Sequence, residues 1–502
     1  MSRRPFPIPF LLLAVALLAC ASGCRKPEKF SSSPVTLEFS EDTIFFDTVF
    51  TTIGTVTKRF VVRNTGTDGV RVDVALEGGS PSPFRINVDG SSGLSFSQVE
   101  IQGRDSIYVF VEATLDANNV ANPLIIEDRI LFNTNGNEQH VQLVAWGRDA
   151  HFFRPDRYIP GLPPFSIIAG VDDSGNPTCE TVTWPNDKPY VIFGYAVVDS
   201  CSTLIIEPGV TVYMHGGAGL WAYRYGRILA EGTVDQRITF RHDRQEPLYD
   251  NLPGQWERIW INDGPAGNDS RFVNVVVRNA LVGFQCENWP GQPTAPTSEA
   301  RLVLNNVQVR NCSAAGILSR NYRIQSVNLL VADCGQYAMA LTGGGQYTFE
   351  HTTIANFWTW DIRNTPSFIL TNTYEDLSGT IQVREIFPSS FRNGIIHGNI
   401  TNEFKVSTNS LAPVDWKFFN YLLRTDQPTN AVANFPDQTT IYRNLNPGFV
   451  APTDGDFHLL STSLAINKGT TVGAPPEAFF DLDGNLRAAD GQADLGCYEF
   501  TP

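Results

Sequence analysis

The sequence predicts an all-β protein in which a β-sandwich precedes a solenoid of stacked β-strand coils. Three observations support this: the composition, a run of short alternating strands, and a repeat of 22 or 23 residues. Apolar residues make up 42% of the 502 residues and charged residues only 18%, with 41 Gly and 32 Pro. Low charge with abundant turn formers favours strands over helices. The formal net charge of −15 argues against nucleic acid as a partner, because nucleic acid binds basic surfaces.

The first residues have the pattern of a secretion signal. Arg3 and Arg4 precede an apolar run over 10–19, which is too short to span a bilayer, and small residues follow it. The segment resembles a bacterial lipoprotein signal, which implies that Cys24 becomes the lipidated N-terminal residue, with Cys20 as the alternative. An ordinary cleaved signal is the competing interpretation. The resemblance implies a membrane partner and an outer-membrane lipoprotein, with its periplasmic or surface-exposed face left open.

The next part of the chain predicts an immunoglobulin-like β-sandwich over 35–150. About seven short strands of alternating polarity are each followed by turn residues, such as Asn64-Thr65-Gly66 and Asn135-Gly136. The pattern resembles exported domains that precede larger modules in bacterial surface and cilia-type proteins. Such domains are mostly spacers or docking units, so we expect no chemistry here.

A repeat of 22 or 23 residues then predicts a solenoid. Its copies VRNCSAAGI, VADCGQYAM and IANFWTWDI begin at Val309, Val331 and Ile354, and VRNALVGF at Val277 is an earlier copy. Units of this length stack because none buries its apolar side alone. The expected columns are Asn279, Asn311, Asp333 and Asn356; Ala280, Cys312, Cys334 and Phe357; and Ile317, Met339 and Ile362. Stacked amides at a bend would satisfy backbone groups and bond to one another.

Two segments carry a family resemblance. LIIEPGVTVYM, followed by a second strand so that Gly209 and Gly232 lie 23 residues apart, resembles the entry coils of right-handed parallel β-helices of the pectate-lyase-like superfamily. DLDGNLRAADGQADLGCYEF from Asp481 resembles the closing segment of secreted β-helix proteins, with Cys497 where Ala is more familiar. The resemblance implies about ten coils at about 4.8 Å each and a C-terminal cap. Function stays open, because the superfamily includes lyases, glycoside hydrolases and non-enzymatic adhesins.

The predicted organisation therefore has six parts. They are a lipoprotein signal peptide (1–23), a tether (24–34), the sandwich (35–150), a connector with N-terminal cap (151–188), the β-helix (189–450) and a C-terminal coil and cap (451–502). Cys179 and Cys201 flank the first strand of the repeat region and are candidates for a disulfide. Cys312 and Cys334 should stack, either as a disulfide or, preferably, as two buried thiols.

No established catalytic motif is present, but acidic residues cluster between 241 and 263. The weak catalytic candidates are Asp243, Asp250, Glu257, Asp263 and Arg258. Glycoside hydrolysis needs paired carboxylates, and a solvated excursion from the rod is the alternative interpretation. A lyase needs a base, yet no Lys lies between 189 and 404, and an unassisted Arg is a poor base.

Aromatic residues supply a second set of candidates, because aromatic faces stack on sugar rings. The candidate ligand-binding residues are Trp221, Tyr223, Tyr225, Trp256, Trp260, Tyr337 and Trp360. The first three alternate along one strand and should share a face, as should the next two. Tyr337 and Trp360 share a repeat column and should stack. Core packing between coils is the alternative interpretation.

Asp481, Asp483 and Asn485 have the 1-3-5 spacing of a calcium loop, but Gln492 stands where its supporting Glu would be. A cap turn held by Asp side chains is the preferred interpretation, so we expect no cofactor and leave calcium as an alternative. Three functional hypotheses remain. The first is a lipid-anchored cell-envelope protein whose β-helix binds a glycan or another surface partner. The others are a polysaccharide lyase or glycoside hydrolase acting near 241–263, and a structural envelope element.

Overall fold

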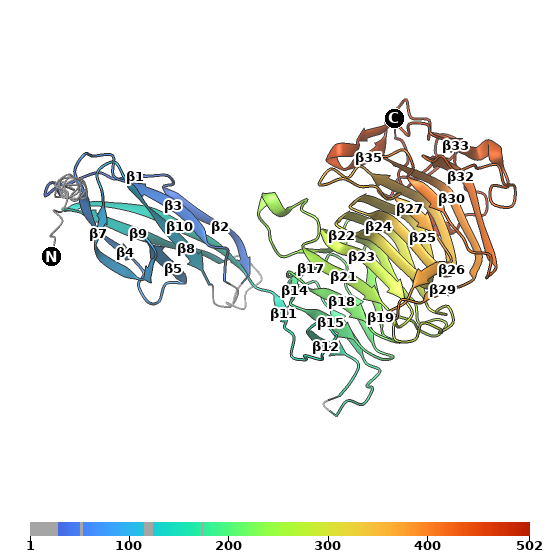
Figure 1. Ribbon diagram of the computed structural model, residues 1–502, viewed down its shortest axis with the longest axis horizontal. Coiled ribbons are helices and arrows are strands. Elements are labelled where there is room, and N and C mark those ends of the chain that lie inside the picture. The colour runs from blue at the N-terminus through green and yellow to red at the C-terminus, as the bar shows by residue number, and fades with distance from the viewer. Residues whose placement is uncertain (1–28, 51–53, 115–123, 173, 502) are drawn as a thin grey trace, which may run out of the picture. The chain divides into compact units, whose positions relative to one another are not determined.

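The computed structural model describes residues 29–50, 54–114, 124–172 and 174–501 (Figure 1). The chain divides into a first unit up to Asp149 and a second unit from Ala150. The predicted lipidation sites Cys24 and Cys20 lie outside the described residues. Within the described ranges, the regular structure is β apart from four short 3-10 helices, and no helix there has the length and apolar character that a membrane crossing requires.

The first unit is the predicted immunoglobulin-like sandwich. One sheet has the order β1 (Glu38–Phe39), β3 (Lys58–Arg63), β8 (Ser106–Ala113), β5 (Phe84–Val88), β6 (Ser91–Gly93). The other has the order β2 (Thr43–Phe50), β10 (Asn137–Arg148), β9 (Leu124–Thr134), β4 (Val70–Leu76), β7 (Ser95–Ile101). Only β2 and β10 pair in parallel among these described strands. Alternate residues such as Phe60, Val72, Val109 and Phe132 fill the space between the sheets.

The second unit is a parallel β-helix, as predicted, with three strands in each of the early coils. Strand β11 pairs with β14, β12 with β15 and β13 with β16, and this spacing of three strands continues as far as the pairing of β19 with β22. Its strands up to β23 are β11 (His151–Phe153), β12 (Phe165–Ala169), β13 (Thr181–Trp184), β14 (Tyr190–Ile192), β15 (Tyr195–Val198), β16 (Thr203–Ile206), β17 (Thr211–Met214), β18 (Gly219–Ala222), β19 (Arg227–Glu231), β20 (Ile238–His242), β21 (Trp256–Ile261), β22 (Ser270–Arg278) and β23 (Ala280–Glu287). The segment expected as a connector, 151–188, thus already contributes strands to the first coil.

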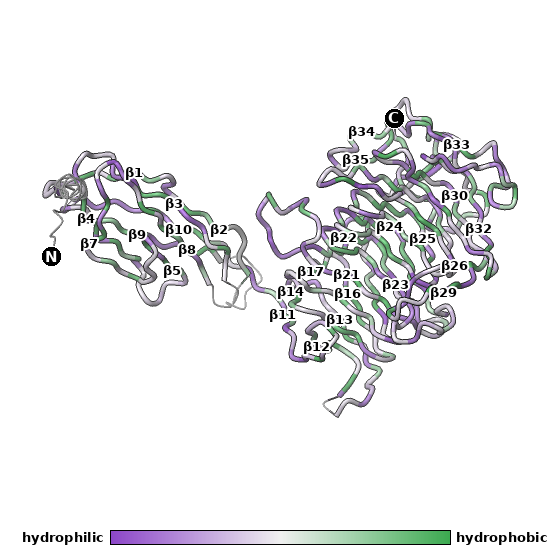
Figure 2. The backbone as a smooth tube through the Cα atoms, in the orientation of Figure 1, coloured by the Kyte–Doolittle hydropathy of each residue, from purple (hydrophilic) through white to green (hydrophobic). Residues whose placement is uncertain are grey.

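Farther along the rod, single strands continue through the corners. They are β24 (Arg301–Cys312), β25 (Ala315–Cys334), β26 (Tyr337–Asn356), β27 (Phe368–Leu370), β30 (Ile386–Gly398), β31 (Phe404–Val406), β32 (Val414–Leu423) and β33 (Ile441–Arg443), with a hairpin of β28 (Thr373–Glu375) and β29 (Ile381–Val383) outside the coils. Apolar side chains from every coil meet in one continuous core, and apolar positions recur along the stacked strands (Figure 2). Stacking therefore buries what a single coil leaves exposed.

We call the three stacked sheets of the rod faces. The first face contains β14, β17, β20 and the last parts of β22, β24, β25 and β26. The second face contains β15, β18, β21, β23 and the first parts of β25 and β26. The third face contains β16, β19 and the intervening parts of the long strands.

The corner between the third and first faces is formed by a column that the repeat did not reveal. Its members have φ between 51° and 58° and are Asn274, Asn306, Asn328, His351, Asn393 and Asn420. Asn and His are among the side chains that tolerate the left-handed region best. Asn306 Nδ2 donates to Asn274 Oδ1 at 3.2 Å, and Asn328 Nδ2 donates to Asn306 Oδ1 at 2.8 Å. These amides form the ladder that was expected at the other corner.

The predicted column of Asn279, Asn311, Asp333 and Asn356 does lie at one corner, between the first and second faces. Its first three members are left-handed, with φ of 68°, 54° and 53°. The side-chain hydrogen bonds of Asn279 and Asn311 reach the loop before β21 rather than each other. That loop lies against the corner and accepts hydrogen bonds from the Nδ2 groups that were expected to bond along the column.

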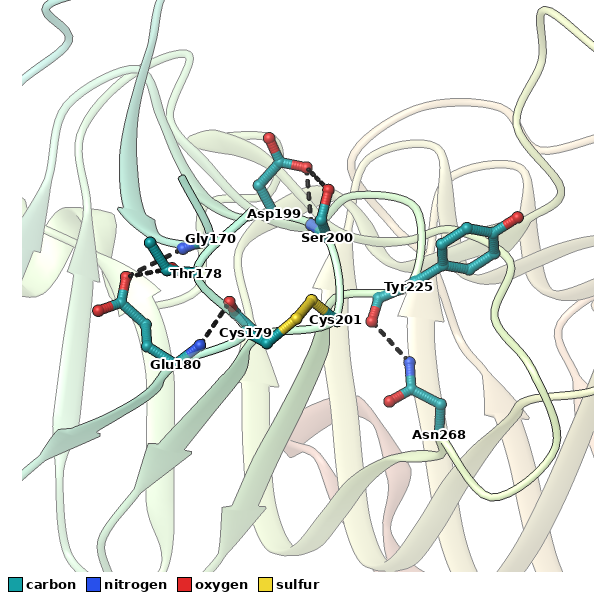
Figure 3. Close-up of a disulfide and its surroundings, with 10 residues drawn as sticks. Gly170, Thr178, Cys179, Glu180, Asp199, Ser200, Cys201, Tyr225 and Asn268 are labelled. Atoms are coloured by element: carbon teal, nitrogen blue, oxygen red, sulfur yellow. Dashed lines mark hydrogen bonds between the residues drawn. A yellow bond between two sulfur atoms is a disulfide. The ribbon is translucent and has the colours of Figure 1, made fainter. Parts of the chain in front are cut away.

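The cysteines follow the prediction. Cys179 and Cys201, 22 residues apart, form a disulfide in the first coils (Figure 3). Cys312 and Cys334 are register partners on adjacent coils, and both are free, buried thiols. Burial raises the pKa of the Cys334 thiol well above its usual value, as expected for a thiol packed in the core.

The predicted repeat column of Ile317, Met339 and Ile362 is correct only as far as Met339. That residue pairs with Phe368 rather than Ile362, because residues 357–366 leave the coil as a loop. Ile362 is 87% exposed and Trp360 is 52% exposed. The predicted stacking of Tyr337 on Trp360 is therefore contradicted: Tyr337 begins β26, whereas Trp360 lies in the loop.

The C-terminal segment lies along the outer side of the first face. Its hairpin of β34 (Phe449–Ala451) and β35 (Asp456–Leu459), and the residues that follow, cover Leu330, Ala355 and Ile395 of that face. The backbone N–H of Cys497 donates to Thr353 Oγ1 at 2.9 Å. The last coil is covered instead by the loop after β32, whose Phe435 packs on Phe418 in the rod core.

Buried polar groups stabilise the closing motif that begins at Asp481. Arg487 and Glu499 form an ion pair at 3.2 Å with both side chains buried. Asp481 Oδ2 accepts from the backbone N–H of Glu499, and Asp494 Oδ2 accepts from that of Phe500. Buried charges need such partners, which accounts for the spacing of acidic residues and arginine in DLDGNLRAADGQADLGCYEF.

Replacing Asn306 tests the corner column. Asn306→Ala removes both amide bonds and leaves alanine in a left-handed conformation, so we expect the free energy of unfolding to fall by about 2–3 kcal/mol. Asn306→Gly removes the same bonds without the left-handed penalty, and should cost about 1 kcal/mol less than the alanine variant. Denaturant unfolding followed by tryptophan fluorescence measures both variants. Equal losses would show that tolerance of the left-handed region is not what Asn306 contributes.

His458 should make the C-terminal segment sensitive to alkaline pH. Its ring nitrogens contact Asp483 at 2.8 Å and Asp456 at 2.6 Å, and the hydrogen bond that the ring donates to Asp483 contributes most to raising its pKa to about 9. Because the pKa is higher in the folded state, this stabilisation is complete below pH 6.5 and is lost as pH rises through 9. His458→Gln should therefore show a smaller drop in melting temperature from neutral to alkaline pH than the unaltered chain. A drop of the same size would refute the assignment.

Candidate ligand-binding groove

Three arginines form a column on the outside of the first face. Phe240 pairs with Val277 and Arg278 pairs with Arg310, so Arg241, Arg278 and Arg310 occupy equivalent positions on three successive coils. Neighbouring parallel strands lie about 4.8 Å apart, so the register brings three positive charges close together. Like-charge repulsion is visible in Arg278, whose pKa is lowered by burial first and by Arg241 next.

Two of these arginines, Arg278 and Arg310, line part of a groove of about 590 Å³. Its lining residues are Asn251, Val276, Arg278, Gln308, Arg310, Asn311, Asp333, Phe357, Trp358, Thr359, Trp360, Thr453, Asp454 and Gly455. They come from the loop before β21, the ends of β22, β24 and β25, the loop after β26 and the helix η3 (Pro452–Asp454). Repeating coils supply the floor, and three segments outside the repeat supply the walls.

Backbone and side-chain amide oxygens rather than carboxylates accept hydrogen bonds from the two arginines of the groove. Arg278 Nη2 donates to the carbonyl oxygen of Asp250 at 2.7 Å and to Asn251 Oδ1 at 2.8 Å. Arg310 Nη1 donates to the carbonyl oxygen of Gly455 at 2.7 Å. Only Arg241 of the column forms an ion pair among those found in the described chain, with Asp250 at 2.7 Å. The groove thus brings two guanidinium groups together on an acidic protein, with Asp333 and Asp454 also in its lining.

Asp333 is the one carboxylate of the corner column of Asn279, Asn311, Asp333 and Asn356, and it lines the groove with Arg278 and Arg310. Its Oδ1 accepts a hydrogen bond from the backbone N–H of Phe357 at 3.2 Å. Burial raises the pKa of Asp333 to about 6, against the lowering effect of that hydrogen bond and of Arg310. The carboxyl group therefore changes its charge close to neutral pH.

The loop after β26 brings an aromatic ring to the rim of the groove. Trp358 is buried and donates from Nε1 to Asp361 Oδ1 at 2.5 Å, which holds the loop in shape. Trp360 lines the groove with its side chain 52% exposed. An exposed indole beside guanidinium groups can stack on a sugar ring while the cations bind its acidic substituents.

The predicted catalytic carboxylates each have a separate partner. Asp243 contacts His215 Nδ1 at 2.6 Å, and Asp250 pairs with Arg241. Glu257 pairs with Arg258 at 2.8 Å, and Asp263 accepts from the backbone N–H of Trp289 at 3.0 Å. Asp263 lines a different cavity of about 640 Å³, together with Tyr225. None of the four appears among the residues lining the arginine groove.

The predicted aromatic residues of β18 and β21 do not share one surface: some lie on the outer side of the second face and one lies in the rod core. Trp221 and Trp260 stack on the outside of the second face with ring centroids 4.5 Å apart, and Trp289 covers Trp221 at 6.2 Å. Tyr223 meets the ring of Trp289 edge-on. The prediction that Trp256 lies on the surface is wrong, because its side chain faces the rod core and is 1% exposed.

The chain changes direction within β21, which explains that error. Trp256 aligns with Ala280 at the corner, and a register irregularity follows between Arg258 and Ile259. Strict alternation would place Trp256 and Trp260 on the same side, but the irregularity places them on opposite sides. Trp256 Nε1 donates to the carbonyl oxygen of Arg278 at 2.8 Å and so supports the groove from behind.

The calcium candidates Asp481, Asp483 and Asn485 form a turn held by an Asp side chain, which was the preferred interpretation of their spacing. Asp481 is buried, and its Oδ1 accepts the backbone N–H groups of Asp483 at 3.0 Å and of Asn485 at 2.7 Å. Asp483 contacts His458 instead of turning toward Asp481. Across the described residues, no group of three or more His, Cys, Asp or Glu side chains has the arrangement of a metal site.

The arginine column was missed as a site, although the sequence carried a signal for it. Arg278 and Arg310 stand at the same place in two copies of Val-Arg-Asn, beside the predicted Asn column. Their alignment becomes apparent only when the two copies of the repeat are compared position by position. The contribution of Thr453–Gly455 to the groove had no local signal, because it depends on the C-terminal segment folding back.

Comparisons with known proteins add little. No model of a protein family matches the chain, and no curated protein matches it. Among solved structures, the ASH/PapD-like domain of human CEP192 is 13% identical with a TM-score of 0.17, covering 26% of this chain and 96% of that one. The CooA pilin subunit from enterotoxigenic Escherichia coli is 11% identical with a TM-score of 0.18, covering 23% and 99%. The Escherichia coli chaperone DraB is 11% identical with a TM-score of 0.17, covering 24% and 58%. No argument rests on likenesses of this size.

Proposed function

We propose that the chain is a lipid-anchored cell-envelope protein whose β-helix binds an acidic glycan in the arginine groove. The observation that carries the proposal is the meeting of Arg278 and Arg310 with the exposed ring of Trp360 in one groove. Guanidinium groups bind carboxylate or sulfate through paired hydrogen bonds, and an indole stacks on a pyranose face. The anchor is proposed from the sequence alone, through Cys24.

Membership of the pectate-lyase-like superfamily, and the right-handed winding that it implies, belong to the same proposal. Their support is the entry strand LIIEPGVTVYM and the closing motif of Asp494 to Glu499, together with the parallel three-strand coils. Outer-membrane placement rests on the lipoprotein signal. We propose no membrane face for it.

The enzymatic alternative has one observation in its favour. Asp333 and Asp454 line the same groove, and glycoside hydrolysis uses two carboxylates on either side of the bond that is cleaved. This would move the predicted catalytic region from 241–263 to the groove. The structural alternative has no comparable observation, and we do not pursue it.

A polysaccharide panel separates these functions. The purified protein is incubated with insoluble neutral, uronate-containing and sulfated polysaccharides, and both retention and new reducing or unsaturated ends are measured. We expect retention on acidic members that weakens as salt rises, without cleavage. New chain ends would favour the enzyme, and absence of retention on every acidic member at low salt would refute glycan binding.

Removing the two groove arginines should abolish most of this retention. We expect Arg278→Gln with Arg310→Gln to weaken acidic-glycan binding at least tenfold, because each charge-assisted contact contributes about 1.5–3 kcal/mol. Arg271→Gln is the matched control, since Arg271 lies on the same strand but pairs with Glu231 on another face. Equal weakening by the control would mean that overall charge rather than the groove governs binding.

The aromatic contribution is tested within one loop. Trp360→Ala should weaken binding about tenfold by removing a stacking surface worth roughly 0.5–1.5 kcal/mol beyond its buried area. Ile362→Ala, at a position that is 87% exposed and outside the lining of the groove, should leave affinity unchanged. Titration calorimetry with a retained oligosaccharide measures both variants. Unchanged affinity of the Trp360→Ala variant would show that the indole does not contribute to ligand binding.

A further inference from the structure

One member of the corner column departs from its neighbours in chemistry. The column has Asn at 279, 311 and 356 but Asp at 333. Asp333 has φ of 53°, close to the 54° of Asn311, and Asn is at least as well suited to that conformation as Asp. The backbone therefore gives no reason for a carboxylate at this place.

The groove does give a reason. Asp333 is the column member whose surroundings include both Arg310 and the backbone N–H of Phe357. It lines the groove on the coil next to Arg310, where Ala332 replaces the arginine of the column. A ligand anion bound by Arg310 would lie next to this carboxyl group.

We propose that protonation of Asp333 controls anion binding in the groove, so that acidic glycan binds more tightly in mildly acidic than in neutral or alkaline solution. This inference rests on the proposed function. When Asp333 is neutral, Arg278 and Arg310 meet the ligand without the competing negative charge of Asp333. When Asp333 is ionised, it attracts Arg310 and repels the ligand.

The other charged groups around the groove come from each of its walls. They are Arg278 and Arg310 on the floor, Asp250 with Arg241 behind it, Asp361 in the loop after β26, and Asp454, Asp456 and His458 from the C-terminal segment. His458, with a pKa of about 9, stays charged below that pH, and the pKa of Asp456 is lowered through its contacts with His458. Among these groups, Asp333 is the one whose shifted pKa, about 6, falls in the mildly acidic range.

Linkage sets the size and sign of the effect. If a bound anion raises the pKa of Asp333 by about one unit, affinity changes about tenfold between the protonated and ionised states. We therefore expect binding to weaken about tenfold in total as pH rises from below about 6, the pKa of Asp333 in the free protein, to above the pKa about one unit higher that it has in the complex. By reciprocity, binding near that pH takes up protons.

The test uses the full chain with low-mass dextran sulfate, because sulfate keeps its charge at every pH used. Affinity is measured by titration calorimetry on both sides of pH 6. Asp333→Asn keeps the acceptor for Phe357 N–H and restores the residue of the neighbouring column positions. It should bind equally at every pH, with the affinity that the unaltered chain reaches only in acid. Glu231→Gln, which alters a carboxylate of another face, should keep the pH dependence.

Proton uptake by the unaltered chain provides a measurement that does not depend on a variant folding. Binding heats at pH 6, compared in two buffers of different ionisation enthalpy, should show net uptake. No pH dependence in the unaltered chain, or the same dependence in Asp333→Asn, would overturn the inference while leaving the groove as a binding site. No binding of dextran sulfate at any pH would overturn both.

Discussion

The structure depends on one constraint: a single coil cannot cover its own apolar side, so every coil must lie in register on the next. Register is maintained because side chains such as Phe284, Ile317 and Met339 fill one continuous interior. A shift of one residue would turn them outward. The left-handed residues at the corners let the chain turn between faces without breaking that register. Stacking and corner geometry together therefore determine which residues meet on the outside.

The arginine groove is a consequence of this register. An arginine repeated at one position of successive coils becomes a column, and Arg278 and Arg310 repeat in this way on the first face. A column of like charge costs free energy, and the charge of Arg241 adds to the larger effect of burial in lowering the pKa of Arg278. The surrounding backbone oxygens offset that cost only partly, because they carry no full charge. Perturbed pKa values cluster at functional sites, and the shifted pKa values of Arg278 and Asp333 in one groove are the physical basis for assigning a site here.

The repeat predicted those parts of the fold that depend on neighbouring coils. Val331 does pair with Ile354, and Cys312 with Cys334, because contacts one repeat apart leave a direct pattern in the sequence. The pairing of Met339 with Ile362 failed, because IANFWTWDI resembles a coil although the chain leaves the rod after Asn356. The walls of the groove could not be predicted, since Gly455 reaches Arg310 across 145 residues of sequence. Patterns shared by neighbouring repeats therefore predict the β-helix. The groove forms only when the loops and the C-terminal segment, which lie outside the repeat, fold against it.

The most direct measurement of the central claim is hydrogen–deuterium exchange of the protein with and without an acidic oligosaccharide. The groove assignment requires protection of peptides from its separate walls and floor: 250–252, 308–311, 357–360 and 453–455. These segments share no sequence neighbourhood, so protection of all four together would identify the groove as the place where the ligand binds. Protection confined to the second face around Trp221 and Trp260, or no protection at concentrations that saturate retention, would contradict the account.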